Sequence, residues 1–451
     1  MRVMKWSMIA LAVAAAASTQ LATAAPFVSD QAEAKGFVDD AKLNLLVRNY
    51  YFNRDNKNGG HDQKDWTQGI WGNFSSGYTQ GLIGVGVDAF GYLAVKLDGG
   101  DGTSGTGNMS RSDTVKANGY AHDVNDSQGK AGAAVKLRVS KTELKFGDMQ
   151  PSTAPVFAVG GSRILPQTAR GFQLQSSEVK DLDLEAGHFY SASSQDKNAL
   201  DGDLWSQYAD NVKANSIDYF GGKYGINDNL SVSLYGAKLE DIWNQYYANV
   251  NLTTPISGDT SLNTDFNIYR TTDTGDAKVG DISNTAYSLA TALTFLKGHT
   301  ITLAFQKVNG DTPFDYVGVG KNNRGGDSIF LANSIQYSDF NGPGEKSAQI
   351  RYDLKMAEYG VPGLSFMTRY VNGWDIDGTN MPTNSKYANY GYGADGKHHE
   401  TNLEAKYVVQ SGPAKDLSFR IRQAWHTANA DQAEGDIKEF RLIVDYPLSV
   451  L

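Results

Sequence analysis

Cysteine is absent from the 451-residue chain, so neither disulfides nor thiolate metal sites are available to it. Beyond the first two dozen residues no segment offers about 18 consecutive apolar residues, which excludes membrane-spanning helices there. The net charge of -9 argues against a nucleic-acid surface. With 40% hydrophobic residues, 48 glycines and 24 tyrosines, the chain is poor in aliphatic side chains for one packed core of this size.

The first residues carry a targeting pattern. Arg2 and Lys5 precede an apolar run over residues 8–17, and small residues occupy positions 22–24. This order is typical of a secretory signal peptide. We therefore expect export and cleavage after Ala24, which leaves residues 25–451 as the folded domain, and the lack of cysteine is compatible with that route.

Segments near the C-terminus alternate apolar and charged residues. Arg420 and Arg422 alternate with Ile421, and residues 403–409 and 439–446 repeat the pattern. Alternation with period two predicts strands that have one apolar and one charged face. In a water-soluble sandwich the apolar face would point inward, whereas in an outer-membrane barrel it would meet lipid and the charges would line a wet bore.

The lengths of the connections between the expected strands favour the barrel. Residues 226–229 and 296–298 form tight links, whereas 191–213 and 271–281 form long ones, as short periplasmic turns and long external loops would. The stretch 98–130 is rich in Gly, Asp and Ser, and we expect it to be an exposed loop.

Counting strands back from the C-terminus gives a consistent register if residues 309–344 form one external loop, with 328–337 as an excursion and not a wall strand. The count is then about 18, an even number, as in single-chain bacterial barrels, while 20 stays possible because short segments defeat periodicity. The predicted fold class is all-β: a transmembrane antiparallel β-barrel of about 18 strands, with long external loops that fold into the bore. Barrels of about 16 to 18 strands leave an aqueous channel.

Residues 149–169 form a different kind of loop. Its three prolines exclude a wall strand, because each removes a hydrogen-bond donor from the ladder. Phe157 and Ile164 make it unusually apolar for an exposed loop. The bore of a wide barrel would cover these side chains and leave Ser162 and Arg163 facing water as a constriction. The alternative is a loop packed on the outer surface.

Several specific strings resemble the OprD family of outer-membrane porins from pseudomonads, and the match runs nearly from end to end. They are Phe27-Val-Ser-Asp-Gln-Ala-Glu-Ala-Lys-Gly36, Arg48-Asn-Tyr-Tyr-Phe-Asn-Arg54, Ala154-Pro-Val-Phe157, Gly161-Ser-Arg163, residues 329–344 and Tyr446-Pro-Leu448. The resemblance implies an 18-stranded monomeric channel in which a ladder of basic residues guides small carboxylate-bearing solutes. It also implies infolded third and seventh external loops, which map to 149–169 and 309–344. The C-terminal Leu451 departs from the aromatic residue usual in outer-membrane barrels.

Nine basic residues alternate with apolar neighbours on their own strands and are predicted to line the pore. They are Arg48, Lys136, Arg138, Arg351, Arg369, Lys406, Arg420, Arg422 and Arg441. Residues two apart on a strand are separated by roughly 6.6 Å, so such a set offers successive contacts to a travelling carboxylate, and weak multiple sites favour flux. The alternative is that each pairs with a carboxylate of the wall: Asp353, Glu404, Glu439 or Asp445.

The predicted function is a porin for small water-soluble solutes, with carboxylate-bearing amino acids or organic acids as the main candidates. A non-selective porin and a barrel hydrolase are the alternatives, and the hydrolase would need a Ser-His pair at the membrane rim. No nucleophile elbow, zinc-ligand spacing or phosphate loop occurs in the sequence. His398 and His399, which precede Glu400, would point to opposite faces of a strand and could not readily share an ion. The expected partners are anionic solutes and outer-membrane lipid, with no cofactor, metal or nucleic acid.

Overall fold

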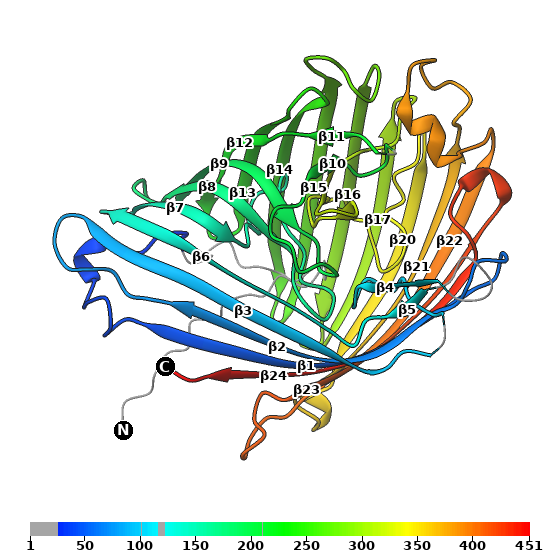
Figure 1. The fold of residues 1–451 in the computed structure, drawn as a ribbon. Helices are drawn as coiled ribbons and strands as arrows, with labels where there is room; N and C mark the ends of the chain where they lie inside the picture. The colour runs from blue at the N-terminus through cyan, green and yellow to red at the C-terminus, as the bar shows by residue number, and fades with distance from the viewer. Residues whose placement is uncertain (1–25, 101, 116–121, 210) are drawn as a thin grey trace.

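The computed structural model describes residues 26–451 apart from residues 101, 116–121 and 210. Its main feature is one 18-stranded antiparallel sheet that closes on itself as a barrel (Figure 1). The first wall strand pairs with the last in a continuous register from Asn44↔Ser449 to Asn56↔Ile437. The prediction of an 18-stranded barrel is confirmed, whereas the expected signal peptide at 1–24 lies outside the described residues.

The wall strands pair with their neighbours in chain order around the ring. They are β1 (Lys42–Asn56), β2 (Gln63–Ser75), β3 (Gly84–Asp98), β6 (Ser127–Val139), β7 (Thr142–Met149), β8 (Thr168–Ser176), β9 (Leu182–Ser193), β12 (Ile217–Asn227), β13 (Leu230–Leu239), β14 (Trp243–Ser257), β15 (Thr260–Asp273), β16 (Ser283–Phe295), β17 (His299–Asn309), β20 (Lys346–Lys355), β21 (Leu364–Ile376), β22 (Gly396–Val408), β23 (Ser418–Ala428) and β24 (Ile437–Ser449).

The connections hold only short elements. They are strands β4 (Arg111–Val115), β5 (His122–Val124), β10 (Leu204–Ser206), β11 (Lys213–Ala214), β18 (Val317–Val319) and β19 (Arg324–Gly325), and 3-10 helices η1 (Gln31–Glu33), η2 (Ala357–Tyr359), η3 (Lys386–Tyr390) and η4 (Ala430–Gln432). No helix among the described residues is long and apolar enough to cross a membrane.

The wall strands divide their side chains between two faces. On β23, Phe419 and Ile421 are 43% and 46% exposed, whereas Arg422, the next residue of the strand, is only 7% exposed. The apolar side chains therefore point away from the bore and the arginines into it. This is the arrangement of a barrel in lipid and not of a sandwich in water.

The two ends of the barrel differ in the lengths of their connections. At the short-turn end the strands are joined by links such as 140–141, 228–229 and 296–298. At the long-loop end the connections include 150–167 and 310–345. The tight link at 240–242 also lies at the long-loop end, as the strand count requires.

The stretch 98–130 is not an exposed loop, so that prediction is wrong. Thr106 and Asn108 are buried, and both donate hydrogen bonds to the buried Asp65 of β2. The last residues of the stretch, from Ser127, already belong to β6. A polar composition predicts an exposed loop only if burial would leave its polar groups without partners. Here the polar groups of wall and loop form hydrogen bonds to each other inside the barrel.

Two of the long connections meet in a small sheet of their own. Its strand order is β11-β10-β18-β19, and Leu204 of β10 pairs with Val319 of β18. The segment 310–345 is otherwise loop between β17 and β20, and residues 328–337 form no strand, as predicted. The small sheet thus joins the connection at 194–216 to the connection at 310–345.

The difference between the ends gives a topological prediction. A short epitope inserted after Gly59, which is exposed in the connection after β1, should be labelled by antibody on intact cells. The same epitope inserted after Gly412, which is exposed in the link between β22 and β23, should be labelled only after the outer membrane is permeabilised. Labelling of the Gly412 variant alone on intact cells would reverse the orientation.

Candidate functional site

The third long connection, residues 150–167, crosses the inside of the barrel. On one side, the indole of Trp71 on β2 donates a hydrogen bond to the Ile164 carbonyl oxygen at 2.6 Å. On the other side, the Tyr269 hydroxyl on β15 donates to the Pro155 carbonyl oxygen at 3.1 Å. Strand β15 stands halfway round the ring from β2. The loop therefore spans the bore, which confirms the predicted infolding and excludes packing on the outer surface.

Arg48 on β1 holds the tip of this loop. Its guanidinium makes two hydrogen bonds to Asp445 on β24, at 2.7 and 2.9 Å. The same group donates to the carbonyl oxygens of Gly161 and Arg163, at 3.0 and 2.7 Å. With its charge paired and its donors directed at backbone, Arg48 holds the loop tip in place and has little capacity left for a solute.

A glycine in the wall makes room for the loop. Gly69 on β2 is the cross-strand neighbour of Arg48. A methyl group at this glycine would lie 3.0 Å from both the side chain and the carbonyl oxygen of Ile164, which is fully buried. A larger residue here would push the loop away from the wall, because such contacts are tighter than side chains accept.

The predicted constriction residues Ser162 and Arg163 lie together at the loop tip. Arg163 donates to the Thr106 carbonyl oxygen at 3.0 Å and to the Ser162 hydroxyl at 3.2 Å, and its guanidinium carbon lies 5.4 Å from the centre of the Phe52 ring. Burial, together with the charge of nearby Arg441, lowers the pKa of Arg163 to about 10. Arg163 therefore stays charged at neutral pH in an enclosed site.

A carboxylate of the long connection 310–345 lies next to this tip. The Asp327 backbone N–H donates to the Ala158 carbonyl oxygen at 3.0 Å, which fixes it against the third connection. Burial raises the pKa of Asp327 to about 6, although the charge of Arg163 opposes that rise. The tip of the bore-crossing loop thus carries a cation, and the charge of an anion in the neighbouring connection is felt there.

The wall from β20 to β24 places basic side chains directly opposite each other. Three cross-strand pairs that face the bore are like-charged: Arg351↔Arg369, Lys406↔Arg420 and Arg422↔Arg441. Like charges at opposed positions destabilise a sheet. Their repetition over five adjacent strands therefore indicates a role other than stability.

Carboxylates compensate part of this charge. Every carboxylate named from the sequence as an alternative partner does pair: Arg351 with Asp353 at 2.7 Å, Arg420 with Glu404 at 2.7 Å, Arg422 with Glu404 at 3.2 Å, Arg441 with Glu439 at 2.5 Å and Arg48 with Asp445. Glu404 serves two arginines of this group. Within the part of the chain that the structure describes, neither Arg369 nor Lys406 forms an ion pair, and Arg369 donates instead to the Asn402 side-chain oxygen at 2.6 Å.

Sequence reasoning missed one basic residue of this group. Arg54 on β1 binds Glu439 at 2.6 Å and its guanidinium lies 5.0 Å from the Tyr337 ring. Asn53 and Asp55 flank it, so the alternation with apolar residues that marked the other arginines is lost there. Its register with Glu439 across the closing seam was the signal, and that register requires the barrel.

Lys136 and Arg138 of β6 lie apart from the constriction, at the short-turn end. Lys136 forms an ion pair with Asp88 at 2.7 Å. Arg138 donates to Gln31 at 2.9 Å and to Ser29 at 2.6 Å, both in the segment that precedes β1. Arg138 therefore holds the N-terminal segment, and Lys136 holds the wall at the short-turn end. Neither residue is contiguous with the basic residues of β20 to β24.

The chain is similar to porins of known structure. A family described as "outer membrane porin, OprD family" matches residues 35–450. Porin D of Pseudomonas aeruginosa is 65% identical over 454 residues, which cover 100% of both chains. The crystal structure of P. aeruginosa OprD matches with a TM-score of 0.82 at 63% identity, covering 94% of this chain and 100% of that one. The crystal structure of P. aeruginosa OpdK with vanillate matches with a TM-score of 0.79 at 34% identity, covering 92% and 100%.

The loop that crosses the bore, residues 150–167, can be shortened between two residues that already contact each other. Gln167 donates its backbone N–H to the Gly160 carbonyl oxygen at 2.8 Å, and Gly160 donates to the Gln167 side chain at 2.7 Å. Deleting residues 161–166 joins two residues that already touch. Single-channel conductance should rise, because the tip with Arg163 is removed while the neck remains. Deleting residues 58–60, which lie in an exposed loop, is the control and should leave conductance unchanged; equal effects would contradict the assignment of the constriction.

Proposed function

Since the chain belongs to the OprD family of outer-membrane porins, we propose that the solutes it passes best are small anions that carry a carboxylate. The observation that carries this proposal is the set of like-charged pairs on β20 to β24, which leaves positive charge facing the bore. Organic acids fit it through their carboxylate. Amino acids fit it if their ammonium group faces Asp327 beside the loop tip.

The chemistry of the guanidinium supports this choice. Arginine presents parallel N–H groups whose spacing matches the two oxygens of a carboxylate, so it distinguishes planar carboxylates from other solutes. Several arginines in succession allow a solute to exchange one contact for the next without being trapped. OpdK, which is similar to this chain, has been crystallised with vanillate, and vanillate carries a carboxylate.

The expected strength of each contact is modest. Two unit charges a few ångströms apart are worth between about 1 and about 4 kcal/mol, from bulk water to a protein surface, and a wet bore lies toward the lower value. Screening over about 8 Å at physiological ionic strength reduces it further. The preference should therefore appear as a faster flux of anions and not as tight binding.

The alternatives have less support. A non-selective porin would have no use for opposed basic pairs that weaken its own wall. A lipid hydrolase needs a serine hydroxyl bound to a histidine ring, and the described residues contain no such hydrogen bond. We infer that the protein acts as a channel without catalysis, because one barrel encloses a complete bore.

Arg369 offers the clearest test of the basic wall. Replacing Arg420 and Arg422 would leave Glu404 unpaired, whereas replacing Arg369 removes a charge that no ion pair uses. The substitution Arg369→Gln should slow uptake of benzoate into liposomes by up to about fivefold, the ratio that follows from roughly 1 kcal/mol. Uptake of benzamide, which has the same ring without the charge, should not change.

A matched control lies on the outer face of the barrel. Arg270 on β15 is exposed, and its guanidinium donates to the hydroxyls of Ser283 and Thr285. Arg270→Gln changes the net charge equally and should leave benzoate uptake as in the wild type. The effect of Arg369→Gln should also shrink at high salt. Equal benzoate flux in all three proteins at low salt would refute the proposal.

A further inference from the structure

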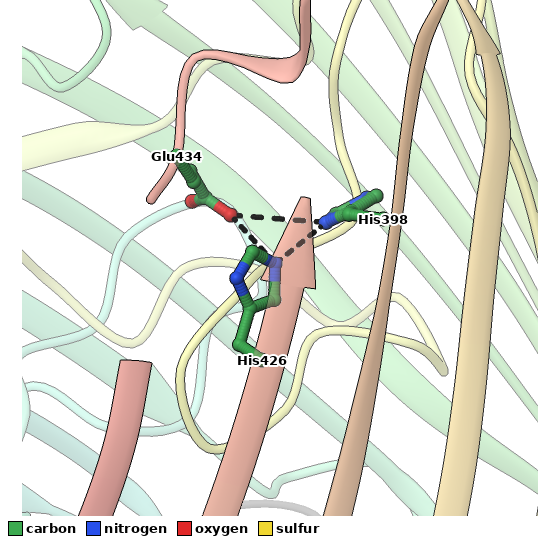
Figure 2. A group of neighbouring side chains, drawn as sticks. All are labelled: His398, His426 and Glu434. Atoms are coloured by element: carbon green, nitrogen blue, oxygen red, sulfur yellow. Dashed lines mark hydrogen bonds and ion pairs between the residues drawn. The ribbon is translucent and has the colours of Figure 1, made fainter. Parts of the chain in front are cut away.

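Two histidines and a glutamate converge inside the long-loop end of the barrel. His398 on β22, His426 on β23 and Glu434 in the connection before β24 direct their side chains at one point (Figure 2). The Nδ1 atom of His398 lies 2.9 Å from Nε2 of His426, and Glu434 Oε2 lies 3.9 Å from the former and 3.6 Å from the latter. Both imidazoles are fully buried, and the glutamate side chain is 15% exposed.

The outer nitrogen of each ring has an acceptor as its partner. His398 Nε2 lies 2.7 Å from Glu345 Oε1, and His426 Nδ1 lies 3.0 Å from the Gly435 carbonyl oxygen. Since a carboxylate and a carbonyl accept hydrogen bonds, these two nitrogens carry the protons of the neutral rings. The inner nitrogens, His398 Nδ1 and His426 Nε2, then face each other with lone pairs. Two lone pairs at that separation repel each other, and either a proton or a metal ion between or beside them would relieve the repulsion.

We propose that His398, His426 and Glu434 bind a divalent transition-metal ion, with Zn²⁺ as the first candidate. Ligand atoms about 2.0 to 2.1 Å from a tetrahedral ion lie about 3.3 Å from one another, and the three observed separations surround that value. Two imidazole nitrogens and a carboxylate oxygen suit Zn²⁺ and leave its fourth position open. Glu345 contacts the outer nitrogen of His398. A carboxylate in that position orients a metal-binding histidine and raises its basicity.

The surroundings would hold the ligands in place. The Phe340 ring stacks on His398 with centroids 4.1 Å apart, and the Tyr337 ring lies 4.9 Å from that of His426. Both aromatic residues belong to the connection 310–345, and Glu345 ends it. A bound ion would therefore link β22, β23 and the connection 429–436 to one another. Through the contacts of the two histidines it would also tie them to the connection 310–345. This inference does not depend on which solutes the channel passes.

The site was not predicted from the sequence because its ligands come together only through the alignment of neighbouring strands. The sequence correctly separates His398 from His399: the former is 3% exposed and faces the bore, whereas the ring of the latter lies beside Tyr370 on the outer face. The second ligand comes from the neighbouring strand, where His426 pairs with Glu400, two residues from His398. The prediction of no metal considered only the adjacent histidines His398 and His399. It therefore overlooked the diagonal pair His398 and His426.

The test uses the folded, purified full-length barrel in detergent, freed of metal with a chelator and then titrated with Zn²⁺ against a chromophoric competitor. One equivalent should bind to the wild type. Binding should weaken by at least tenfold in His426→Gln and in Glu434→Gln, and Co²⁺ added in place of Zn²⁺ should give a tetrahedral absorption spectrum in the wild type only. His399→Gln, which alters the adjacent histidine on the outer face, should bind as the wild type does.

Glu345→Gln separates a built site from chance binding by histidines. Loss of an orienting carboxylate costs metal affinity about 10- to 100-fold, although Glu345 would not touch the ion. Heat-modifiable mobility on gels verifies that each variant is folded, and Glu434→Gln, which lies in a loop, keeps the test open if a strand variant fails to fold. No stoichiometric Zn²⁺ in the wild type, or equal affinity in His426→Gln and His399→Gln, would overturn the proposal and leave a proton shared by the two rings.

Discussion

Closure of the sheet between β1 and β24 is the constraint on which the rest of this structure depends. In lipid no water satisfies the backbone of a free strand edge, so the wall has to be a complete ring. Once the ring is complete, period two assigns each side chain to lipid or to the bore. Eighteen strands enclose more space than wall side chains can fill. The connections therefore enter the bore, and their apolar residues form two separate buried clusters against the wall instead of one core, the larger around Phe157 and Trp243 and the smaller around Phe52 and Trp71.

The charged groups inside the barrel differ in how far their charge is compensated. Asp315 in the connection 310–345 is buried and forms no ion pair with any residue that the structure describes, and burial raises its pKa. It accepts hydrogen bonds from Ser206, Tyr387 and Trp243, at 2.7, 3.0 and 3.2 Å, and so ties three other parts of the chain together. The basic wall is only partly compensated: Glu404 is shared by two arginines, and among the described residues Arg369 and Lys406 form no ion pair. The buried carboxylate in the loop is satisfied by hydrogen-bond donors, whereas part of the positive charge on the wall is not balanced by an ion pair.

The fold and the orientation of the wall residues were predictable because alternation is local. Arg351, Arg420 and Arg441 each stand between apolar neighbours, and that pattern needs no knowledge of the partner strand. Arg54 lacks such neighbours and was missed. The stretch 98–130 was misassigned because a polar composition looks the same in solvent and in a bore lined by Asp65. The meeting of His398 with His426 depends on how two strands are aligned, which no single strand encodes.

The small sheet of β10, β11, β18 and β19 has a mechanical consequence. Its two halves come from connections that leave the ring between β9 and β12 and between β17 and β20, so six wall strands separate their points of attachment. Hydrogen bonds across this span make the sheet a second crossbar inside the cylinder, in addition to the connection 150–167 that runs between β2 and β15. Flattening of the barrel by lateral pressure in the membrane would have to shear those bonds. The cross-section of the pore is therefore stiffened from within, and its width is set by the protein more than by the bilayer around it.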